Sequence, residues 1–211
     1  VEKVVSYLVE NYKNKQRPRG FVYSGDKELI DKVVDGFPYE ETQDQTKAIK
    51  DVFNDLRNNK PMDRLVYGDV GFGKTEVAIR AAILAISSGR VVFFLAPTTV
   101  LSDQHYINCV NRLSPAGVNV ELLSRFKNPT QQKEILKKYE NGEIDLLVGT
   151  HRLLSSDVKT DRLGLLIVDE EHRFGVKHKE AIRRIKGRVD VLTLTATPIP
   201  RTLQQSLVGI R

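Results

Sequence analysis

The residues best suited to chemistry form a run of eight that begins at Gly68 and ends with Lys74 and Thr75. Glycines in such a run let backbone N–H groups close around phosphates, the lysine can reach the β- and γ-phosphates, and the threonine hydroxyl can bind Mg²⁺. Segment 64–67 before it is expected to be a buried strand, and the Ala- and Ile-rich segment 75–88 after it a helix, whose positive end favours anions. The sequence therefore predicts an ATP site made by Gly68, Asp69, Val70, Gly71, Phe72, Gly73, Lys74, Thr75 and Glu76.

A pair of acidic residues, Asp169 and Glu170, follows the apolar segment 165–168. Asp169 can bind Mg²⁺ or its waters together with Thr75, and Glu170 can orient or deprotonate an attacking water. The alternative is an acidic helix cap, which is a common use of such residues. With a phosphate loop upstream, the pattern favours catalysis of ATP hydrolysis by Lys74, Asp169 and Glu170.

Strand-like and helix-like segments alternate along most of the chain. Strands are expected at 64–67, 91–96, 118–123, 145–149, 165–168 and 191–194, and helices at 75–88, 99–113 and 130–141. Apolar strands that alternate with helices predict an α/β fold, with a mainly parallel sheet covered by helices on both faces. Ligands bind such sheets at the carboxyl ends of the strands, where the polar motifs of this chain fall.

Composition narrows the class of protein further. The chain has 211 residues, a net charge of +6, four histidines and a single cysteine. It holds no apolar run long enough for a membrane span, and no His and Cys spacing typical of zinc, so a cytoplasmic protein without a membrane partner is expected. Cys109 is expected to be a small buried hydrophobe, and His105 and His178 are interpreted as structural or solvated.

The first part of the chain has a different pattern. Residues 1–12 carry one apolar stripe at helical spacing, and a connector with a short helix near 26–34 follows. We therefore expect residues 1–36 to form an amphipathic helix and connector, and residues 37–211 to form the nucleotide-binding lobe. Because the chain starts at Val1 and holds one methionine, it is expected to be a piece of a longer polypeptide.

The motifs together resemble those of superfamily 2 nucleic-acid helicases and translocases, which use RecA-like P-loop domains. The resemblance covers residues from about 37 to 211 and is strongest in the branch of RecG-type branched-DNA helicases and bacterial transcription-repair coupling factors. The match is closer to the coupling factors, because of the tract 37–45, Phe72 in the phosphate loop, and Glu171 after the acidic pair. In that tract Gln43 stands where proline is expected.

The resemblance implies roles for further residues. Phe37 would pack on adenine and Gln45 would hydrogen-bond its edge, while His172, Thr195 and Thr197 would couple the nucleotide to the rest of the motor. Contacts to a DNA backbone are implied for Thr98, Thr99, Ser124, Arg125, Gly149, Thr150 and His151. Implied partners are double-stranded DNA, a second RecA-like lobe of the same parent chain, and, through other parent domains, RNA polymerase and excision-repair proteins.

Nothing in these 211 residues resembles the motifs of the second lobe, which supply an arginine finger in the family. The chain is thus expected to be the first lobe of an ATP-dependent double-stranded DNA translocase in transcription-coupled repair, with little turnover alone. Two alternatives stay open: a lobe of a RecG-type helicase, and a nucleotide-gated interaction module that works through residues 1–12. A metabolic P-loop kinase is disfavoured, since the motifs at 149–150 and 195–197 have no role there.

Overall fold

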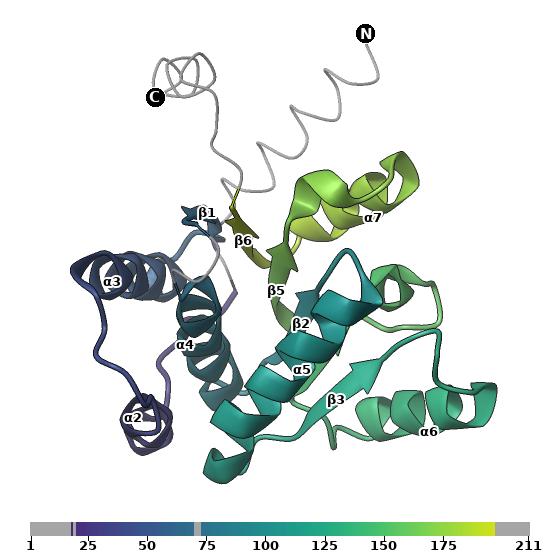
Figure 1. Ribbon diagram of the computed structural model, residues 1–211, viewed down its shortest axis with the longest axis horizontal. Coiled ribbons are helices and arrows are strands. Elements are labelled where there is room, and N and C mark those ends of the chain that lie inside the picture. Colours follow the sequence, from purple (N-terminus) through teal and green to yellow (C-terminus); the bar gives the residue numbers. More distant parts are fainter. Residues whose placement is uncertain (1–17, 19, 70–72, 197–211) are drawn as a thin grey trace, which may run out of the picture.

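A computed structural model describes residues 18, 20–69 and 73–196. Its centre is one sheet of six parallel strands in the order β1-β6-β5-β2-β4-β3 (Figure 1). The strands are β1 (Asp63–Tyr67), β2 (Val91–Leu95), β3 (Val120–Leu123), β4 (Leu146–Gly149), β5 (Leu163–Asp169) and β6 (Asp190–Thr195). Because all strands run the same way, their carboxyl ends lie along one edge. The expected α/β fold with a parallel sheet is confirmed.

Helices cover both faces of this sheet. One apolar cluster joins the sheet to α2 (Lys27–Asp35), α3 (Gln43–Arg57), α4 (Lys74–Ser87) and α5 (Thr99–Leu113). A second cluster joins the opposite face to α6 (Pro129–Glu140) and α7 (Val176–Lys186). Three short 3₁₀ turns, η1 (Ser114–Ala116), η2 (His151–Leu154) and η3 (Glu171–Arg173), complete the described elements. Each expected helix in the lobe is present within a residue of its predicted ends.

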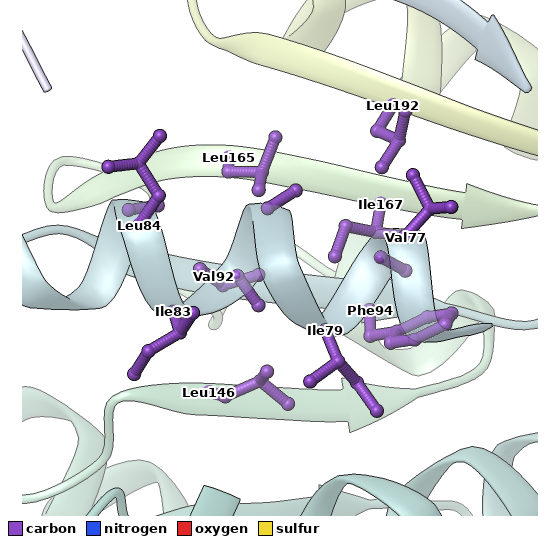
Figure 2. Packing of buried hydrophobic residues seen from close by; sticks show 14 of the residues in the cluster. Val77, Ile79, Ile83, Leu84, Val92, Phe94, Leu146, Leu165, Ile167 and Leu192 are labelled. Atoms are coloured by element: carbon purple, nitrogen blue, oxygen red, sulfur yellow. The ribbon is translucent and has the colours of Figure 1, made fainter. Parts of the chain in front are cut away.

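Helix α4 is the central packing element. It is rich in Ala and Ile, and ten consecutive residues from Glu76 to Ala85 are buried. Figure 2 shows Val77, Ile79, Ile83 and Leu84 facing sheet residues such as Val92, Phe94 and Ile167. A helix with buried residues on every side must be covered all round, and full burial of each large apolar side chain contributes about 1.5–3 kcal/mol. The helix that follows the phosphate loop is thus held firmly in the core.

The structure corrects the prediction for the first strand. Segment 64–67 was expected to be buried, but β1 lies at the edge of the sheet, next to β6 alone. Val66 faces the core, whereas Leu65 is 40% and Tyr67 51% exposed on the other face. The sequence reads as a buried strand because Leu, Val and Tyr suit either position. Strand β3 also begins two residues later than expected, and β5 begins two residues earlier.

The connector ahead of α2 is attached to the amino ends of the neighbouring strands β5 and β6. Tyr23 is fully buried, and its hydroxyl oxygen lies 2.8 Å from the Gly164 carbonyl oxygen and 2.9 Å from Oδ2 of Asp190, the two acceptors available to its single proton. The other oxygen of Asp190 accepts from the backbone N–H of Met62. Described residues of the connector therefore share the core of the lobe, while the division at residue 36 stays a prediction. The proposed helix at 1–12 lies outside the described residues.

Two smaller expectations can be compared directly. Cys109 is 1% exposed in the core, as expected, and burial raises the pKa of its thiol to about 12. Within the described ranges, no helix is both long and apolar enough to cross a bilayer.

Candidate nucleotide site

The phosphate loop lies between β1 and α4, as predicted. Gly73 has a φ of 67°, the left-handed region that favours glycine, and a Cβ there would lie 1.8 Å from Nε2 of Gln45. The ammonium of Lys74 donates to the carbonyls of Gly68 and Asp69. The Lys74 ammonium therefore lies at the start of the loop, where it can also contact the phosphates of a bound nucleotide. Val70, Gly71 and Phe72 lie outside the described residues.

A pocket of about 360 Å³ opens beside the loop. It is bounded by β1, the loop and the start of α3, and its lining includes Gln45, Tyr67 and Lys74. Gln45 holds its place because Thr42 and Gln45 form a reciprocal capping box: each side chain bonds the backbone N–H of the other residue. The amide that the resemblance assigns to adenine is thus oriented beside the phosphate loop, although no pattern in the sequence analysis predicted helix α3.

A second pocket, of about 520 Å³, unites residues from both halves of the sequence. Lys74 and Thr75 enter it from the start of α4, and Asp169 and Glu170 enter it from the end of β5. A hydroxyl and a carboxylate on one cavity suit Mg²⁺, which takes few protein oxygens and keeps its other positions for waters and phosphates. The described residues hold no cluster of three or more His, Cys, Asp or Glu that would form an all-protein metal cage. The residues therefore fit a nucleotide-bound Mg²⁺.

Glu170 is held in an unusual backbone conformation. Its φ is 47°, which makes it the one non-glycine residue with positive φ in the described chain. Oε1 accepts from the backbone N–H of Ala196 (2.8 Å), Oε2 accepts from Thr195 Oγ1 (3.1 Å), and His172 Nδ1 lies 3.3 Å from Oε2. The left-handed turn and these contacts hold the carboxylate in one position at the wall of the pocket. Two of the predicted coupling residues, His172 and Thr195, thus meet at Glu170, and Thr197 lies outside the described residues.

Asp169 has a partner that the sequence analysis missed. Nε2 of His105, in helix α5, lies 2.7 Å from Oδ2 of Asp169, and both side chains are nearly buried. His105 was interpreted as structural or solvated, because a lone histidine in a helix carries no motif. The available signal was its position, since Ser102, His105, Cys109 and Leu113 form the buried stripe of α5.

Glu76 forms an ionic cluster with Arg80 and Arg112, and the ring of Phe37 packs against the two arginines. Glu76 is 4% exposed, and Oε1 accepts from Arg80 (2.6 Å) and from Arg112 (2.7 Å). The guanidinium groups of Arg80 and Arg112 lie 6.0 and 5.3 Å from the ring centre of half-buried Phe37. The carboxylate of Glu76, which was predicted to belong to the nucleotide site, is therefore bound by two arginines. The ring of Phe37 lies against the same two arginines.

The candidate DNA contacts lie along the carboxyl edge of β2, β4 and β3. Thr98 caps α5, with its hydroxyl accepting from the Leu101 N–H, and Thr99 begins the helix. Gly149 ends β4, and a Cβ there would lie 2.4 Å from the Leu123 carbonyl, so the strands approach closely at this point. Three of the candidates are buried and four are partly or fully exposed, the latter being Thr98, Thr99, Arg125 and His151.

His151 stacks on His178 of α7, with ring centres 4.4 Å apart and planes at 21°. Burial lowers the pKa of His151, and the charges of Arg125 and His178 lower it further. The imidazole is thus biased toward its neutral form, which can donate one hydrogen bond and accept another. Ser124, also on this edge, is buried and accepts from the Phe126 N–H through its hydroxyl.

Two known bacterial proteins are similar to this chain over its whole length. The chain is 49% identical over all 211 residues to the transcription-repair-coupling factor of Bacillus subtilis (strain 168), and 51% identical to that of Haemophilus influenzae. It spans 18% of the length of each of these relatives.

A solved structure of RecG bound to a three-way DNA junction is also similar. Its sequence is 34% identical to this chain, and the two structures superpose with a TM-score of 0.80. The match covers 97% of this chain and 28% of the RecG chain. The model of DEAD/DEAH box helicases matches residues 42–206, which is most of the sequence. On this match, and with a phosphate loop and an acidic pair on one cavity, the chain belongs to the DEAD/DEAH box helicase family.

Proposed function

We propose that this chain is the first motor lobe of an ATP-dependent double-stranded DNA translocase of the transcription-repair coupling type. The observation that carries the proposal is the cavity that brings Lys74 and Thr75 together with Asp169 and Glu170. Its support comes from relatives about half identical over the whole chain and named as transcription-repair-coupling factors. Because such a motor works on chromosomal DNA, we place it in the cytoplasm.

Four residues of the cavity, together with Gln45 and Phe37 outside it, have roles in this proposal. Lys74 contacts the β- and γ-phosphates, and Thr75 and Asp169 hold Mg²⁺, which neutralises phosphate charge. Glu170 orients the attacking water and accepts its proton. Glu170 suits the task because two donors, Thr195 and Ala196, fix the orientation of its carboxylate. Gln45 hydrogen-bonds the adenine edge and Phe37 packs near the base, so that ATP is preferred over other nucleotides.

DNA runs along the carboxyl edge of the sheet in this proposal. Thr98 and Thr99 offer hydroxyls and backbone N–H groups to phosphates, with the accessible Arg125 and His151 beside them. The buried candidates Ser124, Gly149 and Thr150 form the strand ends behind these residues. Such contacts position a duplex without reading its sequence. A second RecA-like lobe closes over the nucleotide, and RNA polymerase and excision-repair proteins are engaged by other domains. Residues 1–36 join the lobe to those domains.

The nucleotide part is tested by calorimetric titration of ATP with Mg²⁺ into the chain and into Lys74→Ala. Loss of a charged hydrogen bond of about 1.5–3 kcal/mol lowers affinity roughly 10- to 100-fold. Lys133→Ala, an exposed lysine on α6, is the matched control and leaves affinity unchanged. Equal affinity for wild type and Lys74→Ala contradicts the site.

A RecG-type helicase is the second candidate, favoured by the fold match with RecG over 97% of this chain. The two candidates differ in substrate, because a RecG-type motor acts on branched DNA. A protein that contains this chain and its second lobe is tested on linear duplexes and on forked junctions. ATP turnover that is equal on both supports the translocase, while strong stimulation by junctions alone supports the RecG type.

A further inference from the structure

His105 makes a close contact with the acidic pair from an unrelated part of the chain. It projects from the second turn of α5 and places Nε2 2.7 Å from Oδ2 of Asp169, at the end of β5. The two side chains are 10% and 11% exposed, so water screens the contact little. Both residues line the same pocket as Thr75.

Two neighbours, Asp169 and Phe94, contact the imidazole ring of His105. It stacks on Phe94 of β2, with ring centres 4.3 Å apart and planes at 25°, and Phe94 is fully buried. Nδ1 of His105 has no hydrogen-bond partner among the residues that the structure describes. Because Asp169 is an acceptor, Nε2 of His105 carries the proton that it donates.

This arrangement is costly if packing is the only purpose. A buried polar nitrogen without a partner destabilises the fold, and an apolar side chain could fill the same space beside Phe94. What the imidazole adds is one directed N–H on Asp169. Carboxylates that bind metals are commonly oriented by such hydrogen bonds, and removal of the donor typically costs 10- to 100-fold in metal affinity or activity.

The geometry points to His105 as a positioning residue that holds the Asp169 carboxylate for Mg²⁺ and ties it to helix α5. The inference rests on the proposed function, in which Asp169 binds the metal. With Oδ2 engaged by His105, the carboxylate has one defined orientation and keeps its other oxygen for the cation. His105 orients the Asp169 carboxylate, and this role requires no contact between His105 and the nucleotide.

Helix α5 connects the proposed DNA-binding edge with the nucleotide site. Its first turn carries Thr98 and Thr99, the proposed DNA contacts, and its last turn carries Arg112, which bonds the Glu76 carboxylate beside Thr75. One rigid helix therefore contacts the nucleotide-binding elements at two points and the proposed DNA edge at its start. A shift of α5 would therefore reach Asp169 through the His105 hydrogen bond.

Two substitutions at position 105 separate orientation from packing. His105→Phe keeps an aromatic ring against Phe94 and removes the N–H. His105→Gln loses the ring but places an amide N–H near the position of Nε2. The measurement is the Mg²⁺ concentration that gives half-maximal binding of a fluorescent, non-hydrolysable ATP analogue to the chain. We expect His105→Phe to raise it about tenfold or more, and His105→Gln to stay within about threefold of wild type.

The opposite ranking overturns the inference. If His105→Phe binds as wild type does while His105→Gln is impaired, the ring serves packing alone. Should His105→Phe fail to fold, His105→Gln decides by itself, since a folded Gln variant with a tenfold higher Mg²⁺ requirement also contradicts the role. Asp169→Asn is the reference for the underlying proposal and should lose the Mg²⁺ dependence. If Asp169→Asn keeps it, the metal site itself is wrong and the role of His105 falls with it.

Discussion

Thr195, the last residue of β6, donates a hydrogen bond from Oγ1 to Oε2 of Glu170, 3.1 Å away at the end of the neighbouring strand β5. The same carboxylate accepts from the N–H of Ala196, the residue after Thr195. Glu170 is therefore oriented by the segment that leads out of the sheet toward residue 197. A displacement of that segment would turn the carboxylate away from its present position, and in the proposed motor this would link movement to hydrolysis.

Thr195→Val tests this link, because valine has the shape of threonine without the hydroxyl. Glu170 keeps the Ala196 N–H and its contact with His172, so nucleotide affinity should be unchanged. Turnover by a two-lobe protein that contains this chain should fall about tenfold, which corresponds to about 1.4 kcal/mol. Thr193→Val makes the same change two residues earlier on β6 and serves as control. A rate for Thr195→Val equal to that of Thr193→Val would show that the hydroxyl does not position Glu170.

The backbone of Glu170 predicts a difference between two inactive variants. Its φ of 47° costs a residue with a Cβ about 1–2 kcal/mol relative to glycine. Glu170→Gly and Glu170→Ala both lack the carboxylate and should both stop hydrolysis. Urea unfolding should nevertheless find Glu170→Gly more stable than Glu170→Ala by about 1 kcal/mol. Equal or reversed stability would mean that the turn is not in the left-handed region.

The carboxylate of Glu76 should matter for stability. Two nearly buried arginines, Arg80 and Arg112, share it, and removal of one partner from a buried ionic group costs about 3–5 kcal/mol. Glu76→Gln should therefore lower the free energy of unfolding by roughly this amount, as measured by urea denaturation. The matched control is Glu28→Gln, which breaks the solvent-exposed pair with Lys32 and should have no measurable effect. Similar results for both variants would contradict the proposed importance of the cluster.

His151 predicts a dependence of stability on pH. Burial and the charges of Arg125 and His178 lower its pKa below the ordinary value of 6.5. As the pH falls below that value, the unfolded chain takes up a proton that the folded chain resists, so the free energy of unfolding decreases. Above it both states are neutral and the effect vanishes.

The test compares the pH dependence of unfolding for wild type and His151→Gln between about pH 5 and 7.5. The wild type should lose more stability toward low pH, and His178→Gln should show a smaller loss because one repulsive charge is gone. A steeper loss in His151→Gln than in wild type would mean that the pKa is raised instead.

The sequence predicted correctly that a strand precedes and a helix follows the glycine-rich run, and that a strand ends at the acidic pair, because each is a local string whose neighbours fix its place. An apolar strand carries Asp169 to the sheet edge, and a helix must follow Lys74. The parallel sheet then brings the two strings together, although about a hundred residues separate them. Motif positions were thus sufficient to predict which ends of strands meet.

Contacts between surfaces of different elements were harder to predict. His105 meets Asp169 through the packing of α5 on the sheet, a relationship between residues 64 positions apart. Arg112 reaches Glu76 in the same manner, although the i,i+4 pair of Glu76 and Arg80 was visible in the sequence. Helix α3 had a local signal as well, since Thr42 and Gln45 have the spacing of a capping box. Residues 42 and 45 also belong to the tract that resembles a nucleotide-reading motif, so the same residues indicate both a helix start and a binding site.

Phosphate release tests the central claim, that this chain is half of a motor. The chain holds Lys74, Thr75, Asp169 and Glu170 on one pocket, but nothing in its sequence resembles the second-lobe motif that supplies an arginine. Such an arginine is worth about 10³–10⁵ in rate. Steady-state release is measured for the chain and for a protein that contains it with the second lobe, each with and without duplex DNA.

We predict that the chain alone binds ATP but turns over very slowly, whatever DNA is added, whereas the two-lobe protein is strongly stimulated by duplex DNA. Glu170→Gln in the two-lobe protein should abolish release and leave binding intact. An isolated chain that hydrolyses ATP as fast as the DNA-stimulated two-lobe protein would contradict the account, since the catalytic set would then be complete within these residues.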